Sequence, residues 1–332
     1  MTNFSVFLNN INNLNHFFSL SILDFLYEFG ERIIEFLITI LMFFVNLFPA
    51  NLVEPFQYSF MQRALLTSIM VGLVCGILSC FVVLKRWSLL GDAISHAVLP
   101  GVALAYLWNL PFFIGAFITG SLTSLGIGII ERNSRIKEDA AMGIMFTGAF
   151  ALGVVIISQI ATSTHLMHIL FGNVLGVRMP VLLLTFITSV ISILIVILFY
   201  KELHLYSFDP IQAKALGMNT TIIHYGLMLI LTLTIVASLE TVGIILVVAM
   251  LITPGATAYL LSNNLSIMMI ISGIHGIFSG VVGLYLSFIY DIASGGTIVL
   301  VSTIIFCFFF LMAPGEGILI KWINSKQRNK GI

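Results

Sequence analysis

The sequence predicts an all-α, polytopic bundle of transmembrane helices with about 8 to 10 spans, and three observations lead to that fold class. Hydrophobic residues make up 59% of the 332 residues. Charged residues make up only 8%, whereas ordinary soluble domains contain about 25%. The mean hydropathy is +1.12, and apolar stretches close to the ~20 residues that a membrane-crossing helix needs recur along the chain.

Nine of these stretches follow one another from Ala64 to the C-terminal region. Each is bounded by polar residues, glycine or proline, which are typical of helix ends and turns. The predicted spans are 64–84, 92–109, 111–130, 140–160, 180–200, 221–238, 242–261, 265–290 and 297–320.

The basic residues predict how the spans are oriented. If every span crosses, one side of the membrane receives Lys85, Arg86, Arg132, Arg135, Lys137, Lys201, Lys214, Lys321, Lys326, Arg328 and Lys330. The opposite loops, near 109–111, 163–165 and 291–296, contain no Lys or Arg. This asymmetry places the basic side and the C-terminus in the cytoplasm. Arg178 is the exception on the outer side, where we expect 165–179 to form a half-helix or re-entrant piece.

The sequence divides into three parts. Residues 1–55 form an N-terminal extension without the charged start of a secretory signal, because no Lys or Arg precedes Arg32. Its apolar stretch, 33–48, is just long enough to span, but it also fits an interfacial or accessory helix. Residues 56–320 form the membrane domain, and 321–332 form a basic cytoplasmic tail.

Asp92 and His96 are the main candidate metal ligands. They are spaced i, i+4, so a helix places them on one face. If Lys85 and Arg86 lie at the membrane surface, a rise of ~1.5 Å per residue places Asp92 roughly 9 Å and His96 roughly 15 Å into the membrane. Ionisable groups at that depth are costly and mark an ion pathway, unless the two only pair with each other and fix helix packing. A carboxylate with an imidazole also suits a divalent transition metal.

Three other polar residues are weaker metal candidates. His165 and His168, spaced i, i+3 near the outer mouth, either share a metal or are solvated loop residues. Glu240 lies between two apolar spans, either at the outer interface or in the pathway.

The cytoplasmic loop 206–218 predicts a short helix. Asp209 is placed to cap it, Pro210 occupies its first position, and Gly217 closes it. Such a knob fits docking to a partner, although many loops of this kind are plain connectors.

Several function classes are excluded by what the sequence lacks. The net charge is zero, and no basic tract indicates nucleic-acid binding. No Gly-Lys dipeptide occurs, so there is no P-loop and any energy from ATP must come from a partner. The three cysteines have no metal-ligand spacing.

The motifs resemble those of the permease subunits of the ABC-3 family of bacterial metal importers. The resemblance runs from about Phe56 to about Gly317. It is carried by the run from Lys85 to Ala103, by Asn133 to Asp139, by His168 to Asn173, by Phe208-Asp209-Pro210 and by Ala215-Leu216-Gly217.

The resemblance implies a permease with the fold of type II ABC importers, in the bacterial cytoplasmic (inner) membrane. It implies a second permease subunit, two cytoplasmic ATPase subunits and an extracytoplasmic metal-binding protein, with no enzyme activity and no permanently bound cofactor in this chain. Asp92 and His96 match the family's intramembrane pair, and the manganese and iron branch fits better than zinc. The ATPase coupling residues implied are Phe208, Asp209, Gln212, Ala213, Leu216 and Gly217.

Two other functions remain as alternatives. A permease for a metal chelate, such as a siderophore or cobalamin, would share the architecture but give Asp92 and His96 no ion to meet. An intramembrane aspartyl protease would use Asp92 with Asp291, but Leu89 stands where its GxGD motif requires glycine.

Overall fold

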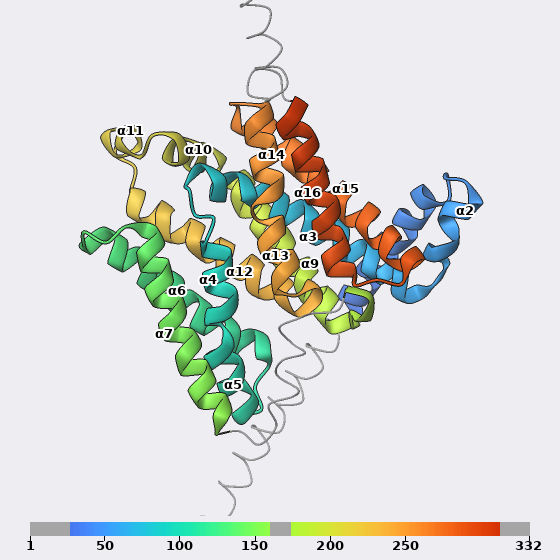
Figure 1. Cartoon of the computed structure of the whole chain (residues 1–332), viewed down its shortest axis with the longest axis horizontal. Helices are drawn as coiled ribbons and strands as arrows, with labels where there is room; N and C mark the ends of the chain where they lie inside the picture. The colour runs from blue at the N-terminus through green and yellow to red at the C-terminus, as the bar shows by residue number, and fades with distance from the viewer. Residues whose placement is uncertain (1–26, 160–173, 313–332) are drawn as a thin grey trace, which may run out of the picture. The chain divides into compact units, whose positions relative to one another are not determined.

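The computed structural model describes residues 27–159 and 174–312, which form helices joined by short turns and loops, with no strand among them (Figure 1). Internal contacts divide the chain into two units, 1–57 and 58–332. The described part of the first unit holds a helix over 27–45, α2 (Ala50–Val53) and the 3-10 helix η1 (Glu54–Gln57).

The second unit is the membrane domain. In the part of the chain that the structure describes, nine helical segments are long and apolar enough to cross a membrane, as the sequence predicts. Its elements are α3 (Ser59–Leu84), α4 (Leu90–Ala97), α5 (Leu99–Leu107), α6 (Phe112–Asn133), α7 (Glu138–Ser158), η2 (Val174–Gly176), α9 (Met179–Leu198), α10 (Tyr200–Phe208), α11 (Pro210–Ala215), α12 (Thr220–Val242), α13 (Ile244–Met250), α14 (Thr253–Leu261), α15 (Leu265–Tyr290) and α16 (Ser294–Met312).

Glycines allow α3 and α15 to pack with their backbones in contact. A Cβ added at Gly276 would collide with the backbone of Gly72, and one added at Gly76 would collide with the carbonyl of Ser272. Small residues at such crossings let van der Waals packing and close contact hold membrane helices together. Glycines therefore bring α3 and α15 into close contact, whereas Gly143 and Gly148 on α7 have no atom within 4 Å of an added Cβ.

Two of the predicted spans are each broken into two helices. The first breaks between α4 and α5 at Val98, and the second between α13 and α14 at Leu251 and Ile252. Pro100 and Pro254 occupy the first turns of the second halves, where a missing N–H is tolerated. Broken helices at membrane depth occur where they are buried in protein or line a cavity.

Contacts at the two ends of the bundle agree with the orientation predicted from the charges. At one end Lys85 contacts Tyr206, and His224 contacts Glu131, which brings together the ends assigned to the cytoplasm. At the other end Arg178 contacts Glu240. Figure 1 shows α10 and α11 together at the edge of the bundle.

Gly276→Ala is expected to destabilise the bundle, because the new methyl group would overlap the backbone of Gly72. Overpacking of this kind costs about 1 to 3 kcal/mol. Gly226→Ala is the matched control, since no atom lies within 4 Å of a Cβ added there. Thermal unfolding of the two purified variants in detergent checks the prediction, and equal melting temperatures would contradict it.

Candidate metal pathway and docking segment

Helix α4 brings Asp92 and His96 together. Asp92 lies in the first turn and His96 in the last, and Asp92 Oδ1 is 3.5 Å from His96 Nε2. The first turn of a helix stabilises a carboxylate, because the free N–H groups there carry partial positive charge. The pair thus presents one oxygen and one nitrogen from the same helix face.

The imidazole of His96 packs against α7. Its ring centroid lies 5.3 Å from that of Phe146 and 5.7 Å from that of Phe150, the latter edge-on. His96 Nδ1 is buried without a hydrogen-bond partner. A buried polar atom without a partner is costly, and such atoms in native proteins call for a specific explanation.

Asp92 is only partly covered by its own chain. Its side chain is 48% exposed, and that of His96 is 31% exposed. A carboxylate within a membrane-spanning segment faces the bundle interior or a water-filled cavity and avoids lipid. The pair is therefore incomplete as the single chain presents it.

The break between α13 and α14 lies beside this pair. A Cβ added at Gly91, the neighbour of Asp92, would lie 3.6 Å from Leu251 Cδ1 and 3.9 Å from Val248 Cγ2. The two broken spans therefore meet next to the acid. In transporters, discontinuous helices of this kind form the substrate site.

The predicted depths of Asp92 and His96 assume a helical rise from Lys85, and this assumption is wrong. Lys85 to Leu89 are not helical, and Arg86 has a left-handed backbone with φ of 59°. The rise of ~1.5 Å per residue applies only from Leu90, where α4 begins. The i, i+4 juxtaposition itself is confirmed.

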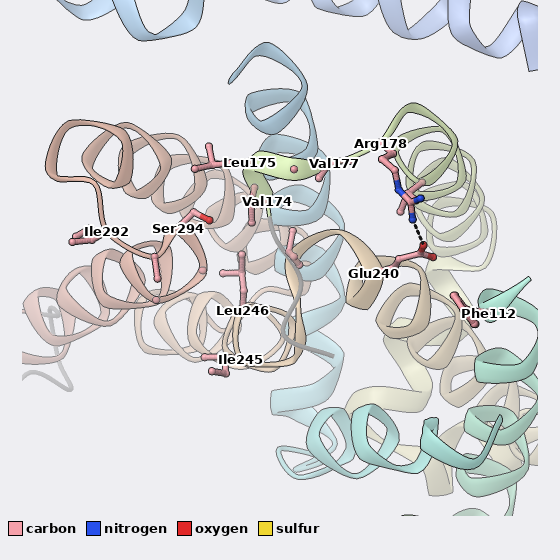
Figure 2. A pocket seen from close by; sticks show the side chains of 16 residues that line it. Phe112, Val174, Leu175, Val177, Arg178, Glu240, Ile245, Leu246, Ile292 and Ser294 are labelled. Atoms are coloured by element: carbon pink, nitrogen blue, oxygen red, sulfur yellow. Dashed lines mark ion pairs between the residues drawn. The ribbon is translucent and has the colours of Figure 1, made fainter. Parts of the chain in front are cut away.

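A cavity of about 660 Å³ opens at the outer end of the bundle, and neither Asp92 nor His96 lines it. Figure 2 shows Arg178, before α9, and Glu240, near the end of α12, pointing toward each other in the lining of this cavity. Their charged atoms are 4.0 Å apart, and the Glu240 side chain is 25% exposed. Arg178, the exception to the charge pattern, thus has an acidic partner.

Among the remaining candidates that the structure describes, Glu240 and Asp291 lie at the outer cavity, and Asp92 and His96 do not line that cavity. His165 and His168 lie outside the described residues. Asp291 ends α15 with φ of 50°, next to Ile292 in the lining of the outer cavity. Asp92 lies in the first turn of α4, only a few residues beyond the cytoplasmic end at Lys85, so the structure gives no acid dyad for a protease.

The loop 206–218 folds as the sequence predicts. Asp209 Oδ1 accepts hydrogen bonds from the backbone N–H groups of Ile211 (3.0 Å) and Gln212 (2.9 Å), which caps α11. Gly217 has φ of 82°, a left-handed conformation that glycine adopts without a steric cost. The result is a short capped helix, which forms a knob.

The surface of this knob differs from the set implied by the resemblance. Ala213 is fully buried, so it anchors α11 to its own chain and offers no surface to a partner. Ile211, which is not in that set, is 81% exposed, and Leu216 is 68% exposed. An apolar residue such as Ile211 in an otherwise polar loop is the sequence pattern that indicates this exposed surface.

No group of three or more His, Cys, Asp or Glu side chains that could hold a metal ion occurs within 27–159 and 174–312. Asp92 and His96 supply two donors, one hard oxygen and one imidazole nitrogen. Such a set suits weak, transient binding of a divalent ion, which conduction requires.

Comparisons with known proteins give one consistent result. Residues 57–313 match the profile of the ABC 3 transport family. The chain is 55% identical over 272 residues to the manganese transport system membrane protein MntC of Listeria monocytogenes, covering 82% of this chain and 96% of that one. It is 49% identical over 255 residues to a probable iron transport system membrane protein of Haemophilus influenzae, covering 77% and 94%.

A solved structure agrees with this result. PsaBC from Streptococcus pneumoniae, in complex with a Fab, has a chain that is 44% identical and superposes with a TM-score of 0.73, covering 80% of this chain and 97% of that one. The profile match alone spans most of the 332 residues. The chain is therefore a member of the ABC 3 transport family and a multi-pass permease of the bacterial inner membrane.

Proposed function

We propose that this chain is the membrane permease of an ATP-driven importer that carries Mn²⁺ or Fe²⁺ into the cytoplasm, with Zn²⁺ as a less suitable cargo. The observation that carries the proposal is the Asp92–His96 pair, a carboxylate and an imidazole 3.5 Å apart on a membrane-spanning helix and half open to its surroundings. The names of the relatives, manganese and iron transport membrane proteins, support the choice of cargo.

The chemistry of the donors also supports these metals. Carboxylate oxygen suits Mn²⁺, imidazole nitrogen suits iron, and neither is the thiolate that would favour tight binding of softer ions. The described cysteines do not lie at this site: Cys75 and Cys80 are buried in α3 and Cys307 is on α16. A cargo must leave as readily as it enters, so two donors per chain fit better than a closed cage.

A second permease subunit completes the site in this proposal. Helix α7 packs on His96, but only 17% of its apolar, membrane-crossing stretch is buried within the chain. Its exposed small residues include Gly143, Thr147 and Gly148, and small residues let membrane helices approach closely. A partner against this face would shield Asp92 from lipid and double the donors to four.

The energy source in this proposal is a pair of cytoplasmic ATPase subunits that dock on α11. The exposed apolar side chains Phe208, Ile211 and Leu216 support this, because apolar side chains at the tip of a water-facing loop suit a partner's groove. Asp209 and Gly217 shape the knob, and Gln212 is exposed on it.

At the opposite face, an extracytoplasmic metal-binding protein would deliver the ion. The outer cavity with Arg178 and Glu240 supports a role at this entrance. Glu240 there remains a weaker candidate ligand than Asp92, because Arg178 already neutralises it.

Asp92→Ala and His96→Ala are each expected to lower cellular Mn²⁺ uptake about tenfold or more, which corresponds to ~1.4 kcal/mol of lost stabilisation of the moving ion. Each substitution removes one of the two donors. Uptake of radioactive ⁵⁴Mn²⁺ by cells that depend on this importer is the measurement, with protein level checked by immunoblot.

Asp139→Ala is the matched control, because Asp139 is exposed in the first turn of α7 at the cytoplasmic end. It should leave uptake unchanged. Normal uptake by Asp92→Ala and His96→Ala at normal protein level would refute the cargo and favour transport of a metal chelate.

Ile211→Glu is expected to abolish transport and co-purification of the ATPase while the permease still folds, because Ile211 is exposed at the knob and contributes no core packing. Ile136→Glu, the same change at another exposed cytoplasmic position, is the control. Pull-down of the ATPase by the tagged permease measures the effect. Undiminished capture by Ile211→Glu would show that α11 does not dock the ATPase.

A further inference from the structure

The short segment between α3 and α4 is held by the helix that precedes α11. Lys85 Nζ donates a hydrogen bond to the Tyr206 carbonyl at 3.1 Å, and the same ammonium lies 3.5 Å from the centroid of the Tyr206 ring. An ammonium over an aromatic face is attracted to it, more strongly where water is excluded. Lys85 is thus attached to α10 in two ways.

The helix that follows α11 holds the same segment. Trp87 is buried, and its ring packs edge-on against His224 of α12 with centroids 5.2 Å apart. His224 Nδ1 lies 2.7 Å from the Tyr206 hydroxyl. Tyr206 and His224, on either side of α11, therefore contact each other and both contact residues 85–87.

The position of Lys85 is maintained against a cost. Burial lowers the pKa of Lys85 to about 8, and the carboxylates of Glu138 and Glu131 act in the opposite direction. A half-buried ammonium with specific acceptors marks a location that the fold maintains. Arg132, also in this region, stacks 5.8 Å from the Tyr225 ring.

Two atoms of this cluster remain without hydrogen-bond partners. Glu131 Oε2 and His224 Nε2 are both buried, and they lie 3.8 Å apart, too far for a hydrogen bond. A small relative shift of α6 and α12 would join them.

We propose that Lys85, Tyr206 and His224 form a link that transmits movement of α11 to α4, and so repositions Asp92 and His96 when the ATPase moves. The three are positioning residues: none touches the metal. The proposal rests on the proposed function, in which α11 docks the ATPase and Asp92 meets the ion. Contiguous packing from α10 and α12 through 85–87 to Leu90, where α4 begins, supplies the path.

The test is the number of Mn²⁺ ions imported per ATP hydrolysed by the complete importer in lipid vesicles, with its ATPase and metal-binding protein. Lys85→Met removes the ammonium but keeps the chain length. We expect the ATPase to remain bound and active while the ratio of Mn²⁺ to ATP falls at least about fivefold, and Lys85→Arg to restore most of it because the charge returns.

Lys201→Met is the matched control, because it makes the same change at an exposed position of α10. It should leave the ratio unchanged. A wild-type ratio in Lys85→Met, or a parallel loss of ATP hydrolysis and transport, would overturn the link, because a purely structural role lowers both together.

A second variant tests the same link if the Lys85→Met protein is not stably produced. Tyr206→Phe removes only the oxygen that lies 2.7 Å from His224 Nδ1 and leaves the carbonyl and ring that hold Lys85. A lowered ratio supports the link and an unchanged ratio overturns it. Failure of Ile211→Glu to release the ATPase would instead count against the proposed docking site, so the two failures are distinguishable.

Discussion

The cost of placing a carboxylate and an imidazole inside a membrane-spanning bundle governs this structure. Asp92 and His96 lie on a helix in a chain that is 59% hydrophobic, and ionisable groups within a membrane-spanning segment are costly unless they face the bundle interior or a water-filled cavity. The fold offsets part of that cost, because Asp92 lies in the first turn of α4, where the free N–H groups carry partial positive charge. What remains is a half-exposed pair that a second subunit and a passing cation would complete.

The helix break after His96 adds a related cost. A continuous helix pairs its backbone N–H and C=O groups internally, whereas the ends of α4 and α13 leave backbone C=O groups that need other partners. Both breaks are followed by a Pro-Gly pair, Pro100-Gly101 and Pro254-Gly255, and in each case the second helix starts one residue before the proline. Gly101 and Gly255 sit where an added Cβ would overlap Gly115 and Ser79, so the second halves are fixed against their neighbours. Helix halves that are packed tightly on their neighbours can move together with those neighbours, and movement of this kind suits alternating access.

Much of this was predictable, and the failures have physical reasons. The nine spans, the side on which the charges lie, the cap at Asp209 and the juxtaposition of Asp92 with His96 depend on local patterns of hydrophobicity, charge and spacing. The two helix breaks were not predicted, because the mean hydropathy of a whole span hardly changes when it contains a Pro-Gly pair. The predicted depth of Asp92 fails because it applies a helical rise from Lys85 onward, and nothing local in the sequence shows the left-handed turn at Arg86. The cluster around His224 was missed because it joins residues that are distant in sequence, and a lone histidine on an apolar helix gives no sign of its neighbours.

The most direct test of the central claim is whether the imidazole of His96 touches the metal. Pulsed electron paramagnetic resonance of Mn²⁺ bound to the purified permease detects a nitrogen within coordination distance. The account predicts a nitrogen hyperfine coupling that disappears in His96→Gln, while Mn²⁺ still binds weakly through Asp92. Mn²⁺ surrounded only by water and oxygen in the native chain, or a nitrogen signal that survives His96→Gln, would contradict it.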